Sequence, residues 1–501
     1  MLKKLRQSLA AVSIIMVTLL FLDFTGTVHA WFGWMAKIQF LPALLALNLG
    51  VIVALVALTL LLGRVYCSVI CPLGIMQDGF AWFGKKAKKN RYSYSPAKNI
   101  LRYVMLVIMA IAIIAGIGSV VALLAPYSAY GRIVQSILAP VWAFFNNLLA
   151  SWAEKEGSYS FYTIDIWLKS GITLGVAILT LVALGILAWR NGRTYCNTVC
   201  PVGTVLGLLS RFSLFRPVID TSKCNGCGLC ARNCKSACID SKSHKIDYSR
   251  CVTCMDCLSK CNKGAISYAF SPKANMKAGN EAIAADTDSK NVDNGRRQFL
   301  TAGVAIATAA AATAQEKVVD GGLAVIEDKK IPHRKTRIVP PGAQSIRNLT
   351  THCTACQLCV SVCPNGVLRP SSDVLTLMQP ESSYERGYCR PECTKCSNVC
   401  PTGAILPISV ADKSSIQIGH AVWVKENCVP VTDGVECGNC ARHCPAGAIL
   451  MVPSVAGDDS SPKIPVVNTE RCIGCGACEN LCPSRPFSAI YVEGHERHRV
   501  I

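Results

Sequence analysis

The sequence predicts a membrane-embedded α-helical bundle joined to two α+β modules of the ferredoxin-like class. Long apolar runs lie almost entirely before residue 190, and a bilayer span needs about 20 consecutive apolar residues. Six runs of four cysteines then hold most of the 29 cysteines in the chain. Four of the six have the C-x2-C-x2-C-x3-C spacing that is the [4Fe-4S] ligand pattern of bacterial ferredoxins, and the other two depart from it only between their first and second cysteines. Structural zinc sites instead favour separated C-x2-C pairs.

Four stretches are long and apolar enough to span a bilayer, at 8–28, 40–62, 101–125 and 167–189. Basic residues gather before the first span and between the second and third, while acidic residues prevail between the third and fourth. The positive-inside rule therefore places both ends of this unit, residues 1–217, in the cytoplasm. We expect no cleavable signal peptide, because the first apolar run is long and lacks a small-residue cleavage site. The amphipathic segment 132–152 is expected in the outer interface or against the bundle.

An internal repeat follows the second and fourth spans. Residues 63–74 read GRVYCSVICPLG and residues 192–203 read GRTYCNTVCPVG. The repeat should bring four thiols to one membrane surface: Cys67, Cys71, Cys196 and Cys200. Three interpretations remain open, namely a tetrathiolate metal site, a redox-active dithiol pair, or a structural cap on two helices.

Ionisable residues are scarce in the predicted spans. Asp23 is either a proton acceptor for quinol or an interfacial residue near the outer surface. His29 is the only histidine before residue 244. A transmembrane b-type haem needs paired axial histidines, so no haem is expected.

Residues 218–270 are predicted to form a two-cluster ferredoxin domain. Crossed ligation would combine three cysteines of each run with the last of the other. The two expected ligand groups are Cys224, Cys227, Cys230 with Cys261, and Cys251, Cys254, Cys257 with Cys234. Lys235 and Asn262 stand where bacterial ferredoxins usually have proline. The leftover Cys238 is interpreted as a buried small residue and not a ligand.

The chain then becomes polar at 271–295, which is typical of a linker. Residues 296–315 (RRQFLTAGVAIATAAAATAQ) resemble a twin-arginine export signal placed internally, the alternative being an ordinary fifth helix. A second linker is expected at 316–344. Twin-arginine transport carries folded proteins, which suits a domain already loaded with cofactors.

Residues 345–494 carry the other four runs. Their cysteines are Cys353, Cys356, Cys359, Cys363; Cys389, Cys393, Cys396, Cys400; Cys428, Cys437, Cys440, Cys444; and Cys472, Cys475, Cys478, Cys482. The resemblance of these four runs to four-cluster electron-transfer subunits implies that the first and last runs exchange their fourth cysteines, and the two inner runs likewise. The whole chain would then hold six [4Fe-4S] clusters, whose negative charge removes about 12 of the +20 formal charges. Nucleic acid is therefore not an expected partner.

The two GRxYCxxxCP motifs, PYSAYGR at 126–132 and the paired cysteine runs resemble NapH, the membrane ferredoxin of periplasmic nitrate reduction, with relatives in methylamine utilisation and in NosR. The RRQFL motif, PPGA at 340–343 and four cysteine runs, of which the second and third have irregular spacing, resemble NapG. Together they resemble a NapH–NapG fusion. The resemblance implies a quinol dehydrogenase-type component of the bacterial inner membrane. Residues 218–270 would be cytoplasmic and residues 345–494 periplasmic.

The function expected from these features is electron transfer from the quinone pool to a periplasmic reductase or c-type cytochrome, with no side chain acting as a nucleophile. An alternative is a maturation factor that reduces a metal or thiol for a periplasmic metalloenzyme, since related membrane-ferredoxin copper reductases share GRxYCxxxCP. A redox sensor is a weaker third interpretation, because the sequence has no evident output domain.

Overall fold

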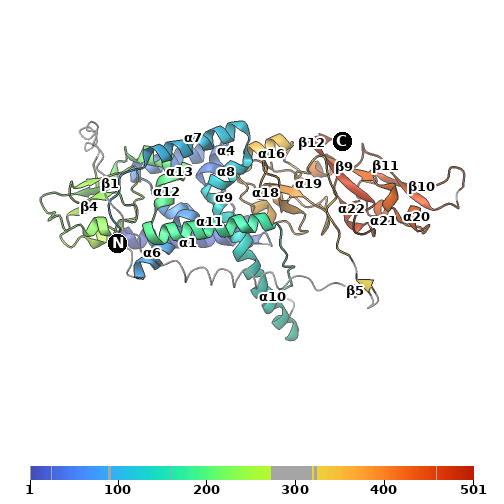
Figure 1. Ribbon diagram of the computed structural model, residues 1–501, viewed down its shortest axis with the longest axis horizontal. Helices are drawn as coiled ribbons and strands as arrows, with labels where there is room; N and C mark the ends of the chain where they lie inside the picture. Colours follow the sequence, from blue (N-terminus) through green and yellow to red (C-terminus); the bar gives the residue numbers. More distant parts are fainter. Residues whose placement is uncertain are drawn as a thin grey trace, which may run out of the picture.

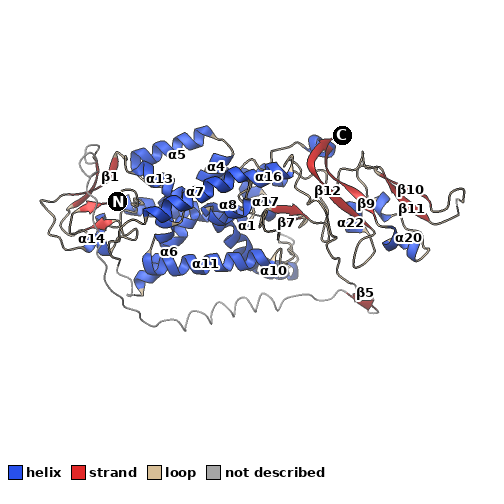
Figure 2. Cartoon of the chain, turned by 45° about the horizontal axis from the view of Figure 1, so that its top comes forward, coloured by secondary structure: helices blue, strands red, loops and turns tan. Residues whose placement is uncertain are grey.

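The molecule consists of three parts in a row along its longest axis (Figure 1). A small strand-containing module lies at one end, helices form the middle, and a larger strand-containing module lies at the other end (Figure 2). The computed structural model describes residues 2–23, 25–87, 92–158, 161–271, 319–320, 324–325, 327–458 and 460–501. The segment 296–315, with its twin-arginine-like motif, lies outside the described residues.

The middle part contains three helices long and apolar enough to cross a membrane, among the described residues. They are α1 (Leu2–Leu22), the continuous helix Pro126–Lys155, and α11 (Gly171–Asn191). The first and last correspond to the first and fourth expected spans. The predicted second and third spans are each divided into two shorter helices. The prediction of four uninterrupted spans is therefore not matched by the described helices.

The breaks have local causes. The second expected span divides into α4 (Phe40–Leu45) and α5 (Leu49–Leu62), because Leu47 has a positive φ and Asn48 caps α5. The third divides into α7 (Asn99–Ala115) and α8 (Gly118–Leu124) at Gly116, which has a φ of 70°.

The helix Pro126–Lys155 combines α9 (Pro126–Ile133), η2 (Val134–Leu138) and α10 (Ala139–Lys155). Every residue of α9 is buried, whereas α10 points away from the bundle (Figure 1). The expected interfacial segment 132–152 thus begins in the core of the bundle and continues into a helix with exposed aromatic residues, including Trp142, Phe144 and Phe145.

Shorter helices complete the middle part. They are α2 (Thr27–Phe32), α3 (Trp34–Lys37), η1 (Tyr66–Ile70), α6 (Pro72–Lys86), α12 (Thr194–Thr198) and α13 (Pro201–Ser210). The two copies of the sequence repeat form equivalent breaks, one between α5 and α6 and the other between α11 and α13.

The smaller end module, which we call the first module, is closed by β1 (Phe215–Ile219) and β4 (Ile266–Phe270). These strands pair antiparallel, with Phe215 opposite Phe270. Between them lie α14 (Leu229–Arg232), β2 (Ile239–Asp240), β3 (Lys245–Ile246) and η3 (Leu258–Lys260). Short strands around two cysteine-bearing loops are the expected ferredoxin-like arrangement.

The larger end module, which we call the outer module, is built on two antiparallel strand pairs. They are β9 (Ile416–Trp423) with β12 (Ile490–Val500), and β10 (Ile449–Pro453) with β11 (Lys463–Val467). The remaining elements are β5 (Val319–Asp320), β6 (Ala324–Val325), α16 (Ile346–His352), α17 (Leu358–Ser361), β7 (Leu368–Pro370), β8 (Pro380–Ser382), α18 (Lys395–Val399), α19 (Val410–Ser415), η4 (Lys425–Asn427), α20 (Val429–Thr432), α21 (Asn439–Arg442) and α22 (Ala477–Leu481). Part of the expected linker 316–344 also belongs to this module, because Ile338 and Val339 are buried and Arg334 pairs with Glu479.

Candidate functional site

The 24 cysteines of the six runs gather into six sets of four thiols. Numbered by their place along the molecule, the sets in the first module are set 1 (Cys224, Cys227, Cys230, Cys261) and set 2 (Cys251, Cys254, Cys257, Cys234). Those in the outer module are set 3 (Cys353, Cys356, Cys359, Cys400), set 4 (Cys389, Cys393, Cys396, Cys363), set 5 (Cys472, Cys475, Cys478, Cys444) and set 6 (Cys428, Cys437, Cys440, Cys482). Set 1 surrounds a cavity of about 170 Å³.

The outer-module sets differ from the pairing expected from the sequence. The first two runs exchange their fourth cysteines, as do the last two. The expected combination of Cys353 with Cys482, and of Cys389 with Cys444, is therefore wrong. Each adjacent pair of runs closes its own two-cluster unit, which requires only a short connection between partners.

The outer-module sets follow one another in space. The backbone N–H of Cys389 in set 4 donates to the carbonyl of Cys475 in set 5 (2.9 Å). Cys478 of set 5 in turn lies close enough to Cys440 of set 6 for the two to interact electrostatically. Sets 3 to 6 thus form one row that begins at the helical part.

A seventh group of thiols, the central set (Cys67, Cys71, Cys196 and Cys200), lies buried where the two repeat copies meet. Every pair among these four thiols is close enough for electrostatic interaction. Cys71 and Cys200 are the N-caps of α6 and α13, with proline at the next position. The positive ends of two helices therefore face the thiols.

The arginines of the repeat cross-brace the two copies. Arg64 of the first copy donates to the carbonyl of Cys196 (3.1 Å), and Arg193 of the second donates to the carbonyl of Cys67 (2.7 Å). Each also reaches a sulfur, at 3.7 Å between Arg64 and Cys67 and 3.8 Å between Arg193 and Cys196. Because the two copies have the same spacing, their residues form a pseudo-twofold site. The Gly-Arg that begins both copies is the sequence feature from which Arg64 and Arg193 could have been identified as site residues.

Lys235 fastens the first module to the helical part. Its ammonium pairs with Asp78 of α6 (2.9 Å) and with Asp256 (3.2 Å), while its carbonyl accepts from the backbone N–H of Arg193 (2.7 Å). Asp78 also pairs with Arg193 (2.7 Å). The departure from the usual proline after the fourth cysteine therefore has a docking role that the sequence alone did not indicate.

Cys238 lies beside set 2. It is buried, and its sulfur is 3.5 Å from that of Cys234. It also interacts with Cys251, another member of the same set. The expected small buried residue is therefore in contact with two of the thiols of set 2.

A narrow cavity, which we call the slot, lies where the outer module meets the helical part. Its volume is about 140 Å³, and it is lined by Phe21, Trp142, Gln135, Lys169 and Gln357, among others. Gln357 sits between two thiols of set 3 in sequence. With the Gln135 amide oriented to satisfy its partners, its oxygen accepts a hydrogen bond from the Lys169 ammonium (2.7 Å). Burial lowers the pKa of Lys169 to about 8.

Asp23 does not offer a free carboxylate. Its two oxygens accept from the backbone N–H groups of Thr25, Gly26 and His29, and the second also lies 3.1 Å from the His29 ring. Asp23 therefore caps the turn after α1, which favours the structural interpretation over a proton acceptor for quinol.

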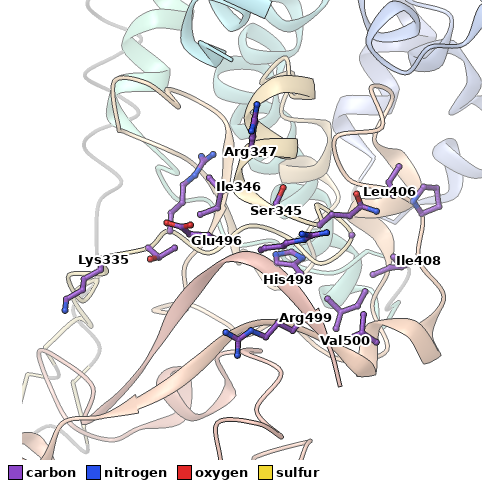
Figure 3. A pocket seen from close by; sticks show the side chains of 17 residues that line it. Lys335, Ser345, Ile346, Arg347, Leu406, Ile408, Glu496, His498, Arg499 and Val500 are labelled. Atoms are coloured by element: carbon purple, nitrogen blue, oxygen red, sulfur yellow. The ribbon is translucent and has the colours of Figure 1, made fainter. Parts of the chain in front are cut away.

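A broad hollow of about 1090 Å³, the basic basin, opens on the outer module. Figure 3 shows Lys335, Arg347 and Arg499 around it, with Glu496 as its labelled acidic residue. Arg337 and Arg497 line it as well. Burial and the nearby His495 lower the pKa of His498, which also lines the basin, to about 4, so this ring is neutral near pH 7.

The thiol sets do not have the geometry of single-ion sites. Among the described residues, no three His, Cys, Asp or Glu side chains converge closely enough to hold one metal ion. In a [4Fe-4S] cube each thiolate binds a different iron, so its four ligands stand further apart around an inorganic core. The arrangement therefore fits cubes better than zinc.

Comparisons with known families agree with this chemistry. A 4Fe-4S binding domain family matches residues 44–91 and 173–219, which contain the two copies of the repeat. Two 4Fe-4S dicluster domain families match residues 352–405 and 434–485. The first match contains all eight cysteines of the first unit, and the second contains seven of the eight cysteines of the other unit, since Cys428 precedes it. The protein thus carries multiple [4Fe-4S] clusters bound through its cysteines.

The similarity to individual proteins is partial. An uncharacterised Methanocaldococcus jannaschii protein, MJ0749, is 38% identical over 22% of this chain and 42% of its own length. The putative electron transport protein YccM of Escherichia coli is 25% identical over 48% of this chain and 60% of its own length. The ferredoxin-type protein NapH of Escherichia coli is 26% identical over 44% of this chain and 67% of its own length.

The methylamine utilisation protein MauN of Paracoccus denitrificans and the regulatory protein NosR of Stutzerimonas stutzeri match the chain at similar identity. This protein is a distant relative of the NapH, MauN, YccM and NosR membrane polyferredoxins. It is an iron–sulfur protein whose helices are long and apolar enough to cross a membrane. No solved structure matches it significantly.

Proposed function

We propose that the protein oxidises quinol in the slot and passes the electrons through the outer module to a periplasmic acceptor, from a position in the bacterial inner membrane. One observation carries this proposal: an apolar cavity with a buried amine lies directly against the thiol loop of set 3. An apolar cavity of about 150 Å³ is large enough for a benzene ring, and the slot measures about 140 Å³. The apolar tail of a quinol would extend along the exposed face of α10.

Two side chains have defined tasks in this proposal. Gln135 and Lys169 hydrogen-bond one quinol hydroxyl, and the neutral amine of Lys169 accepts one of the two protons that oxidation to quinone releases, while the other proton leaves to water. A cluster held by the thiols of set 3 would supply the one-electron acceptor for each of the two electrons. Trp167 keeps the slot closed toward the outer module, because the guanidinium groups of Arg369 and Arg386 lie 4.4 and 4.9 Å from its ring centre.

The basic basin supports an acidic partner protein as the acceptor. Its arginines and lysine greatly outnumber its acidic residues, and complementary charge accelerates the association of electron-transfer partners. A periplasmic reductase or c-type cytochrome with an acidic face would satisfy this requirement.

Turnover with a quinol analogue tests the proposal. Purified protein carrying Lys169→Met or Gln135→Leu should lose quinol oxidation by about tenfold or more, because a hydrogen bond to a charged group contributes about 1.5–3 kcal/mol. Lys155→Met is the control, since Lys155 is exposed at the end of α10 and does not line the slot. Unchanged turnover in both slot variants contradicts the proposed site. Wild-type protein that reduces copper or thiols but not quinone analogues supports the maturation-factor alternative instead.

A further inference from the structure

The central set is placed where it could join the two ferredoxin-like modules. We infer that Cys67, Cys71, Cys196 and Cys200 together hold a further iron–sulfur cluster, which carries electrons through the helical part between set 2 and set 3. The 4Fe-4S description of the matching family covers both repeat copies but names no ligands. The inference rests on the clusters of the proposed function and is independent of quinol oxidation.

Charge is the first argument. Arg64 and Arg193 are fully buried beside the central set. Among the described residues no carboxylate pairs with Arg64, whose partners are the side chain of Asn197, the carbonyls of Cys196 and Ser249, and the Cys67 sulfur. One guanidinium nitrogen of each arginine has no hydrogen-bond partner. A buried cation without a counter-charge is costly, so the site is expected to hold negative charge.

A cube with four thiolates supplies that charge, about −2 when oxidised. Arg64 has no carboxylate partner among the described residues. Arg193 shares the single carboxylate of Asp78 with Arg6 and Lys235, so positive charge remains to offset the cluster. A structural cap or a pair of neutral dithiols would leave the cation of Arg64 facing uncharged sulfur. The lack of three converging ligands among the described residues also argues against a single ion at this position.

Continuity of the core is the second argument. One buried core contains Cys254 of set 2, three thiols of the central set, and Cys356 of set 3. On the side of set 3, Arg132 lies between Tyr195 and Cys356 and interacts with both. Arg132 is fully buried, and no carboxylate among the described residues pairs with it. The helical part therefore has thiol sets at both faces and one in between.

The transfer itself needs no chemical bond to change. One electron leaves the reduced cluster of set 2, which becomes oxidised, and reduces the central cluster. The same electron then passes to set 3 and leaves the central cluster oxidised. No proton is taken up or released in these steps.

Metal content tests the site. Anaerobically reconstituted full-length protein should contain about 28 irons and about 28 sulfides per chain, seven cubes of four, against about 24 if only the six sets are filled. Cys67→Ser combined with Cys196→Ser should lower both counts by about four. A wild-type count near 24 that the double variant does not change overturns the inference.

A milder variant keeps the test decisive if the double variant does not fold. Arg64→Gln retains the four thiols but removes one cation that interacts with both the central set and Cys251 of set 2. The reduction potentials of two clusters should therefore become more negative while the others stay fixed, and a shift confined to one cluster contradicts the assignment. Arg102→Gln is the matched control, because Arg102 is equally buried and also donates to the Ser249 carbonyl, yet it contacts none of the thiols. Equal potentiometric titrations of Arg64→Gln and wild type contradict the assignment.

The connecting role has its own readout. In quinone-free vesicles with the first module facing outward, a membrane-impermeant viologen should bleach the clusters of both modules in wild type. In the Cys67→Ser, Cys196→Ser variant it should bleach only sets 1 and 2. Equal bleaching in wild type and the double variant refutes the connection. If wild-type protein shows the expected bleaching of both modules but does not oxidise quinol, only the proposed function is refuted.

Discussion

Buried arginines mark the places where the end modules meet the helical part. Arg64 and Arg102 both donate to the carbonyl of Ser249 in the first module. Arg193 is hydrogen-bonded to the backbone of Lys235, and Arg132 lies beside Cys356 of the outer module. Burying a guanidinium is tolerated only when hydrogen bonds and opposite charge compensate for lost hydration. These side chains therefore specify how each module docks.

Lys169 leads to a prediction about pH. Its folded pKa of about 8 lies below the usual 10.5 because burial disfavours the charged form. Below pH 8 the amine is protonated and cannot accept the quinol proton, so the rate of quinol oxidation should rise from about pH 6.5 to 8 and level off above it. In Lys169→Met this rise in rate should disappear. The check is the initial rate of quinol oxidation as a function of pH, and a rise that persists in the variant means that another group accepts the proton.

The same shift has a defined effect on stability. The unfolded chain binds the Lys169 proton more tightly than the folded chain. Folding should therefore become more favourable as the pH rises from about 8 to about 10.5, as far as this one group is concerned.

Some single residues could be interpreted from the sequence and others could not. The Gly-Arg shared by the two repeat copies pointed to a real feature of the site. Lys235 and Lys169 gave no signal, because their roles depend on Asp78 and Gln135, which lie far away in the chain. Asp23 allowed two interpretations, since only coordinates show that its oxygens are used by the following turn.

At the scale of elements, the two helix breaks of the repeat form one pseudo-symmetric unit. A Cβ on Gly74 would lie 2.3 Å from the carbonyl oxygen of Cys67 and 2.6 Å from Arg193. A Cβ on Gly203 would lie 2.2 Å from the carbonyl oxygen of Cys196 and 2.8 Å from Arg64. Glycine is thus required at the same point in both copies, where the cross-bracing arginine passes.

This arrangement predicts the outcome of Gly74→Ala. The added methyl group must displace backbone or Arg193, which should destabilise the protein by about 1–3 kcal/mol and lower the iron content. Gly79→Ala in the same helix is the control, because nothing lies within 4 Å of its Cβ position. That control should be neutral or more stable by up to about 1 kcal/mol. Thermal unfolding of detergent-solubilised protein measures both, and equal midpoints for the two variants contradict the close packing.

Element boundaries were less predictable than element types. Hydropathy located the apolar stretches, but it cannot reveal the positive φ of Leu47 or the helix C-cap at Gly116. These two features divide two of the stretches into separate helices. Cysteine spacing defined three ligands of each cube and left open which run supplies the fourth. Proximity in three dimensions decides that question, and here it favours the adjacent run.

At the scale of the whole molecule, the first module and the outer module lie at opposite ends of the helical part (Figure 1). If the long helices lie across a bilayer, this arrangement would put one module at each side. The sidedness expected from the basic residues near the first spans remains a prediction. The fusion with a NapG-like half and the twin-arginine motif remain predictions.

Export of the outer module can be tested directly. Arg296→Lys with Arg297→Lys should retain the outer module inside, leave α1 and α11 inserted, and abolish electron delivery to a periplasmic acceptor. Protease added to spheroplasts should digest residues 345–494 in wild type and spare them in the variant. A module that resists protease in wild-type spheroplasts, and is digested only after lysis, shows that both modules lie in the cytoplasm.

The pseudo-twofold construction of the central set also bears on ancestry. Each repeat copy contributes two thiols, one arginine that crosses to the other copy, and one glycine that makes room for it. Two identical polypeptides, each with a single copy, could therefore assemble the same four-thiol site across a symmetry axis. Duplication and joining of one such gene would then release the two copies to diverge, as Gln77 illustrates: it contacts Cys196, and its counterpart in the second copy is Leu206.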